Sequence, residues 1–173
     1  MTTPEFSRPV RADQVRRMTG DVHVAADAAE RAALAKRFGL AALDRLEADY
    51  VLTEEDGAIL ARGRLRAALA QPCVATAEPV PETVDTDFTL RFVVEEGSAV
   101  EGEELELDAE DVDTIGYDGQ QIDMGEAVAE TMALAMTPYP RSPQADTALK
   151  EAGVLSEEQA GPFAALLALK GEG

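Results

Sequence analysis

The stretch Glu47–Leu69, EADYVLTEEDGAILARGRLRAAL, contains the strongest structural signal in the chain. Apolar and polar residues alternate on both sides of Asp56-Gly57, and a period of two is typical of a half-buried β-strand. Asp-Gly supplies the backbone conformation that a two-residue β-turn needs, so the pattern predicts a β-hairpin. This loop places Asp49 opposite Arg64, and acids remain opposite arginines if the loop shifts to Glu55-Asp56.

The second strand of this hairpin presents Arg62, Arg64 and Arg66 on one face, because every second side chain of a strand points the same way. The row has two interpretations that the sequence leaves open. It is a ladder that binds RNA phosphates, or a solvated sheet face on which the arginines pair with acids across the strands. Arg16 and Arg17 extend the row if the fold brings them to it, and these five residues are the candidate RNA-binding residues.

Capping signals predict two longer helices. Asp27 and Glu30 form a capping box that opens a helix over Asp27–Phe38. Asp123 and Glu126 form a second capping box that opens a helix ending near Met136. Shorter elements complete the expectation: strands near Glu5–Val10, Val22–Ala25, Thr83–Val94 and Thr114–Tyr117, and helices over Ser142–Ala152 and from Pro162 onward.

These elements predict an α+β fold. The expected sheet is an antiparallel β-meander or a partly closed barrel, with helices supplied by the N-terminal and C-terminal thirds. We expect one domain over residues 1–173, with an acidic loop at 95–113 and a short helical C-terminal extension at 142–173.

The charge is concentrated in one part of the chain. The net charge is −19 over 173 residues, and residues 78–130 hold 18 acidic side chains against Arg91 alone. The densest part, Glu95–Asp113, holds ten acids and no base, and a run of like charges is usually a solvated loop. The alternative is a contact surface for a basic protein, with these candidate residues: Glu101, Glu103, Glu104, Asp108 and Asp111.

The sequence gives no support for catalysis. His23 is the only histidine and Cys73 the only cysteine, and no serine lies in a G-x-S-x-G elbow. Glycine-rich nucleotide fingerprints and sets of zinc ligands are missing from the sequence, so we expect no cofactor, no metal and no small-molecule substrate. The start of the chain lacks the apolar core of a signal peptide, and no apolar run is long enough for a bilayer. We therefore expect a cytoplasmic binding protein that is not an enzyme and has no membrane partner.

Four stretches, in this order, resemble the YceD family of large ribosomal RNA subunit accumulation proteins. They are Gly63–Gln71 followed by Cys73, Thr83–Phe92, Ile115–Glu130 running on to Pro138, and Pro162–Lys170. The helix at Ala28–Phe38 is similar to the alphaproteobacterial branch of the family. The resemblance implies a ribosome-assembly factor that is needed for synthesis or accumulation of large-subunit (23S) ribosomal RNA, and it implies no catalytic residues.

Many members of this family carry a second cysteine three residues after the first, whereas Thr76 stands there in this chain. A zinc-type site is therefore not carried over. The expected partner is large-subunit rRNA or its precursor particle. The alternative is an acidic protein-binding module that engages a basic ribosomal protein or assembly factor without touching RNA.

Overall fold

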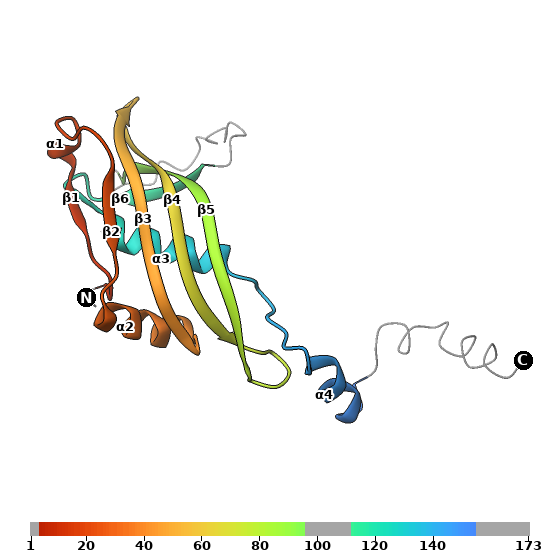
Figure 1. Cartoon of the computed structure of the whole chain (residues 1–173). Helices are drawn as coiled ribbons and strands as arrows, with labels where there is room; N and C mark the ends of the chain where they lie inside the picture. The colour runs from red at the N-terminus through yellow and green to blue at the C-terminus, as the bar shows by residue number, and fades with distance from the viewer. Residues whose placement is uncertain (1–3, 96–111, 155–173) are drawn as a thin grey trace, which may run out of the picture. The chain divides into compact units, whose positions relative to one another are not determined.

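The computed structural model describes residues 4–95 and 112–154 (Figure 1). The chain forms two compact units, one of Met1–Ala70 with Pro81–Met136 and one of Gln71–Val80 with Thr137–Gly173. The elements, in chain order, are β1 Pro9–Arg11, α1 Ala12–Val15, β2 Val22–Ala25, α2 Ala28–Phe38, β3 Ala42–Glu55, β4 Ala58–Pro72, β5 Pro79–Val94, β6 Asp113–Tyr117, β7 Gln121–Asp123, α3 Met124–Ala135 and α4 Ala145–Glu151.

The predicted hairpin is confirmed as β3 and β4. Glu55 faces Ala58 across the turn, so Asp56 and Gly57 are its two loop residues. Both have positive φ angles, 51° and 76°, as a turn of this handedness requires. Asp49 lies opposite Arg64, as the predicted register has it.

The main sheet has the strand order β2-β3-β4-β5-β6, and the predicted α+β class is confirmed. β2 pairs antiparallel with β3, and β3 pairs antiparallel with β4, as in a meander. The prediction of a meander fails at β6, which pairs with β5 in parallel. A partly closed barrel is also wrong, because β2 and β6 form the two edges of an open sheet, and β1 pairs with β7 in a separate ribbon.

The two capped helices form where their capping residues predict them. Asp27 caps α2 through the backbone N–H of Glu30, and the Glu30 carboxylate accepts from the Asp27 N–H, which completes the capping box. α2 ends at Gly39, whose φ of 65° is left-handed. Asp123 caps α3, but the carboxylate of Glu126 does not complete a second box and instead binds the Arg37 guanidinium.

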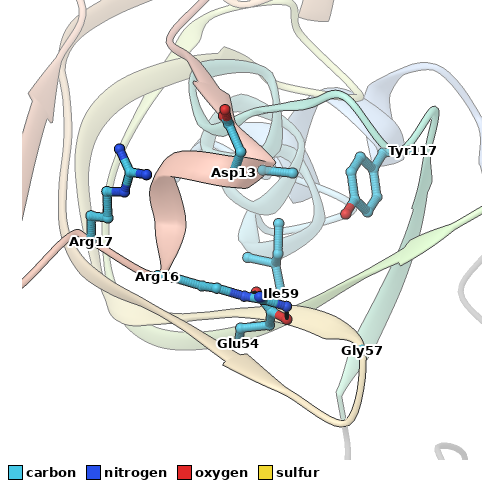
Figure 2. Close-up of a pocket in the computed structure, with 8 residues that line it drawn as sticks. Asp13, Arg16, Arg17, Glu54, Gly57, Ile59 and Tyr117 are labelled. Carbon is cyan, nitrogen blue, oxygen red and sulfur yellow. Dashed lines mark hydrogen bonds and ion pairs between the residues drawn. The ribbon is translucent and has the colours of Figure 1, made fainter.

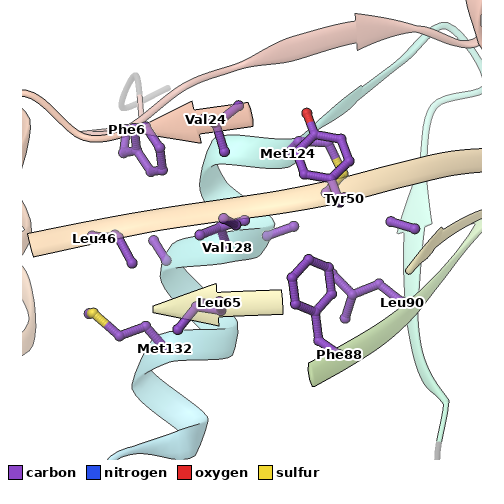
Figure 3. Close-up of a cluster of buried hydrophobic side chains, with 14 of the residues drawn as sticks. Phe6, Val24, Leu46, Tyr50, Leu65, Phe88, Leu90, Met124, Val128 and Met132 are labelled. Carbon is purple, nitrogen blue, oxygen red and sulfur yellow. The ribbon is translucent and has the colours of Figure 1, made fainter. Parts of the chain in front are cut away.

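The core of the first unit lies between the sheet and α3, which runs behind the strands (Figure 1). Tyr50, Leu65 and Leu90 point inward from three strands and belong to the same buried cluster as Val128 and Met132 of the helix (Figure 3). Each of these side chains is at most 2% exposed. The opposite face of the same strands therefore carries the polar side chains.

The remaining expectations concern the chain ends. Of the predicted helix over Ser142–Ala152, the part Ala145–Glu151 forms α4, whereas the helix expected from Pro162 lies outside the described residues. The strand expected near Glu5–Val10 is found as β1, which is shorter and begins later in the chain, at Pro9. In the described part of the chain, no helix is long and apolar enough to cross a membrane.

Candidate binding surfaces

The predicted arginine row lies together on the outer face of the sheet, where acids from β3 and β5 bind it. The Arg64 Nε donates to the Asp85 carboxylate at 2.6 Å. The Arg66 guanidinium donates to Asp49 at 2.8 Å, and Arg62 donates to Glu55 at 2.9 Å. The second interpretation of the row, a solvated face with cross-strand ion pairs, describes this geometry.

Further ion pairs extend from this row across β3 to β2. Glu47 accepts from both Arg45 and Arg66, and the imidazole of His23 lies 2.7 Å from the Asp49 carboxylate. The hydrogen bonds from His23 and Arg66 lower the pKa of Asp49 below its usual value. The acids therefore stay ionised, and they offset the arginine charge that a phosphate ladder would need. We call this set of paired residues on β2–β5 the outer-face grid.

Arg16 and Arg17 do not extend the arginine row. They follow α1, and the Arg16 guanidinium binds the Glu54 carboxylate, with 2.6 Å between Nε and Oε2. Glu54 and Glu55 are consecutive residues of β3, so their side chains leave opposite faces of the strand. Arg16 and Arg62 therefore hold neighbouring glutamates from opposite sides of the sheet.

A hollow of about 470 Å³ lies beside the hairpin turn (Figure 2). It is lined by residues from α1, the hairpin and β6: Ala12, Asp13, Arg16, Arg17, Glu54, Gly57, Ile59 and Tyr117. Among the described residues, Arg17 forms no ion pair, whereas Arg16 is held by Glu54. The hollow thus combines one available guanidinium with one aromatic ring, and we call it the corner hollow.

Cys73 lies in the second unit, where it is 4% exposed. Its Sγ accepts hydrogen bonds from the backbone N–H groups of Ser142, at 3.2 Å, and Ala75, at 3.4 Å. The Ser142 N–H, followed by the hydroxyl of Thr76, lowers the pKa of the thiol to about 6. The hydroxyl oxygens of Thr76 and Ser142 are within hydrogen-bond distance of each other, at 3.2 Å. Over the described ranges, no group of three or more His, Cys, Asp or Glu residues has the arrangement of a metal site.

A junction that sequence reasoning missed surrounds Asp123. Its carboxylate accepts from the Ser7 hydroxyl at 2.5 Å and the Arg8 backbone N–H at 2.7 Å, besides capping α3 through the N–H groups of Gly125 and Glu126. The segment before β1 is thereby bound to the start of α3. We call this set of contacts the Asp123 junction.

Gly125 is the residue that lets the two segments approach. A Cβ atom at this position would lie 2.4 Å from the backbone oxygen of Phe6 and 2.9 Å from the Arg8 nitrogen. The signal in the sequence was a glycine in the first turn of a helix, where alanine is otherwise favoured. Such a glycine marks a close backbone approach.

The five candidate protein-binding acids, Glu101, Glu103, Glu104, Asp108 and Asp111, lie outside the described residues. Their assignment stays a prediction. The two ends of the acidic run are described: the Glu95 N–H donates to the backbone oxygen of Tyr117, and Asp113 begins β6. The run thus connects the end of β5 to the start of β6.

Comparison with protein families identifies a relationship. The family model described as large ribosomal RNA subunit accumulation protein YceD matches residues 61–170, which is more than half of the chain. Searches of curated proteins and of solved structures found no match. The match begins in β4 and includes β5, β6, β7 with Asp123, and α3. The chain belongs to the YceD family of large ribosomal RNA subunit accumulation proteins.

Proposed function

We propose that the chain supports accumulation of large-subunit rRNA by binding a basic protein of the assembling particle, and not by catalysis. Family membership gives the role in accumulation of this RNA. The single observation that carries the choice of partner is the pairing of Arg64 and Arg66 in the outer-face grid. An arginine that already binds a carboxylate gains little binding free energy when it exchanges that carboxylate for a phosphate.

Long-range electrostatics supports the same choice. Residues 78–130 carry 18 acidic side chains and one arginine, and the whole chain carries −19. A charge of this sign repels a nucleic acid and attracts a basic protein, with a range of about 8 Å at physiological ionic strength. The basic proteins of a ribosomal subunit are partners of the complementary charge.

The arrangement of the two reactive side-chain types supports binding over catalysis. His23 pairs with Asp49 on the outer face, where the two side chains are 56% and 41% exposed. Such an exposed pair lacks the enclosure that gives catalytic groups their altered reactivity. The pKa of the Cys73 thiol is lowered, but the residue is only 4% exposed and its sulfur accepts two backbone hydrogen bonds, which limits its access to a substrate.

The test compares two partners with one variant set. Binding to purified basic large-subunit proteins and to large-subunit rRNA fragments is measured across a salt series, for the natural chain and for Arg62→Gln, Arg64→Gln and Arg66→Gln together. A matched control replaces Arg11, Arg91 and Arg141 by Gln, which changes the net charge equally. We expect salt-dependent binding to a basic protein, and weak RNA binding that both variants lower alike.

The proposal fails if RNA binds more tightly than every basic protein and only the first variant abolishes the RNA binding. In that case the arginine row is the RNA surface. It also fails if no basic large-subunit protein binds the natural chain at low salt.

A second function, direct contact with RNA at the corner hollow, is favoured by the presence of both Arg17 and Tyr117 in its lining. A guanidinium binds phosphate, and an aromatic ring stacks on an unpaired base. Arg17→Gln and Tyr117→Leu would then each weaken RNA binding, while binding of a basic protein would stay unchanged. Equal RNA binding by the natural chain and both variants contradicts this second function.

A further inference from the structure

The two edges of the main sheet differ in how far they are covered. β5 spans Pro79–Val94, but β6 pairs with it only over Leu90–Val94. In the part of the chain that the structure describes, no strand pairs with residues 81–89 on that side of β5. We call residues 81–89 the open margin of β5. A backbone edge of this kind offers hydrogen-bonding groups to another extended chain.

The opposite edge is blunted. β2 has only four residues and pairs with the middle of β3. Beyond β2, the helix α1 contacts β3, and Arg16 holds Glu54 near the end of the strand. Short strands and covering elements are common means by which proteins protect sheet edges. Among residues 4–95 and 112–154, no strand pairs with the open margin of β5 on the side away from β4.

The side chains of the open margin are acidic on the outer face. Val84 and Phe88 point into the core, whereas Asp85 and Asp87 are exposed. The Asp87 side chain is 81% exposed and lies 3.8 Å from Arg64, the only described cation within ion-pair distance of it. No lysine or arginine occurs between Pro79 and Leu90.

We propose that the open margin of β5 receives an extended, lysine- or arginine-rich segment of a partner protein as an added strand. This inference rests on the proposed function and names the surface that would carry it. Main-chain hydrogen bonds of the added strand would supply affinity that depends little on sequence. Asp87 would supply the preference for charge, because its side chain is 81% exposed and a basic side chain of the added strand can fall on the same face.

Charge also selects among the possible occupants. Residues 96–111 of this chain hold eight acidic and no basic side chains, so they would place like charges beside Asp85 and Asp87. RNA carries the same sign as the margin and has no amide backbone for it to pair with. A second copy of β5 would bring its own aspartates. A basic polypeptide has both the positive charge and the amide backbone that the margin can bind.

The experiment uses the full chain with two nine-residue peptides. One alternates lysine with threonine or valine, and the other has glutamate in place of lysine. Binding is measured by fluorescence anisotropy, and amide hydrogen exchange is followed by NMR. We expect binding of the lysine peptide alone, with slowed exchange at alternate amides of residues 81–89 and unchanged exchange in β2.

A charge-reversal pair sharpens the result. Asp87→Lys should weaken binding of the lysine peptide about fivefold, because an attraction across the strands becomes a repulsion. The matched control is Asp21→Lys, an exposed acid beside β2 at the other edge of the sheet, and it should leave the affinity within about twofold. Lysine is a common edge-strand residue, so Asp87→Lys is compatible with folding.

The remaining outcomes separate this inference from the proposed function. If the chain binds a basic protein but residues 81–89 gain no protection and the two variants behave alike, the inference is overturned and the proposed function stands. Protection of these amides in the free monomer would show that the chain itself occupies the margin, and protection that rises with protein concentration would show a second copy. Either result overturns the inference. Failure to bind any basic partner overturns both.

Discussion

The outer-face grid and the Asp123 junction both depend on carboxylates, but the carboxylates of the grid bind exposed arginines, whereas that of the junction is part-buried and binds backbone N–H groups and a hydroxyl. In the grid, the side chains of Arg64 and Asp85 are each about half exposed, at 50% and 45%. In the junction, the carboxylate of Asp123 accepts four hydrogen bonds, and the neighbouring Gly125 is buried against the backbone. Exposed ion pairs contribute little to stability, whereas buried hydrogen-bonded groups are costly to disturb.

The comparison indicates that the Asp123 junction stabilises the fold, whereas the outer-face grid contributes little to stability. The stretch that most resembles the family includes Ile122 through Glu126, and the structure uses these residues to join α3 to the segment before β1. The arginines of the outer-face grid lie instead at exposed positions, where a substitution costs little stability. Four substitutions, from the largest expected effect to the smallest, test this difference.

Gly125→Ala should lower the free energy of unfolding by about 3 kcal/mol, because the new Cβ meets the Phe6 and Arg8 backbones and overpacking of this kind is costly. Chemical denaturation measures the change. Helix propensity alone predicts the reverse, a gain of about 1 kcal/mol from the same substitution. An unchanged or raised stability would therefore show that the close approach is absent.

Asp123→Ala should cost about 2 kcal/mol, because it removes a helix cap and leaves the N–H of Arg8 and the hydroxyl of Ser7 without their acceptor. Asp27→Ala is the matched control, since Asp27 only caps α2 and about 1 kcal/mol is expected there. Equal losses in the two variants would mean that the anchoring of the N-terminal segment adds nothing.

Arg64→Gln should change the free energy of unfolding by less than about 0.5 kcal/mol, because its pairs with Asp85 and Asp87 are solvated. The same denaturation experiment, repeated in high salt, should reduce even this difference. A loss of unfolding free energy as large as that of Asp123→Ala would show that the grid stabilises the fold as much as the junction does. This result would contradict the difference between the two regions.

Glu130→Gln should raise stability slightly at neutral pH, by about 0.3 kcal/mol. Partial burial, followed by the nearby Glu126 carboxylate, raises the pKa of Glu130 above 4.5. A raised pKa means that the folded chain binds the proton more tightly than the unfolded chain, so ionisation costs stability as the pH rises through this value. The benefit of the glutamine should therefore disappear below pH 4.5, and a benefit that persists there would have another origin.

Local signals in the sequence predicted the local structure well. Asp56-Gly57 predicted the hairpin, its loop and its register, because a two-residue turn fixes which residues face each other. The capping box at Asp27 predicted the start of α2, and the predicted end at Phe38 is also confirmed. The cross-strand pairs of the arginine row followed as one of two alternatives from the same register.

Contacts between distant segments were not predictable in the same way. The pairing of Val10 with Ile122 and the parallel pairing of β6 with β5 depend on how the whole chain closes, and short polar strands carry no signal for their partners. The position of Arg16 and Arg17 on the other side of β3 depends on the path of the chain after α1. These are the places where the expected meander and the expected extension of the basic row failed.

The most direct test of the account is cross-linking of the natural chain to large-subunit precursor particles, before and after nuclease treatment, with the cross-linked peptides and nucleotides identified by mass spectrometry. The account predicts cross-links to a basic ribosomal protein that survive nuclease. Cross-links from Arg62, Arg64 or Arg66 to rRNA, together with loss of the association after nuclease, would contradict it.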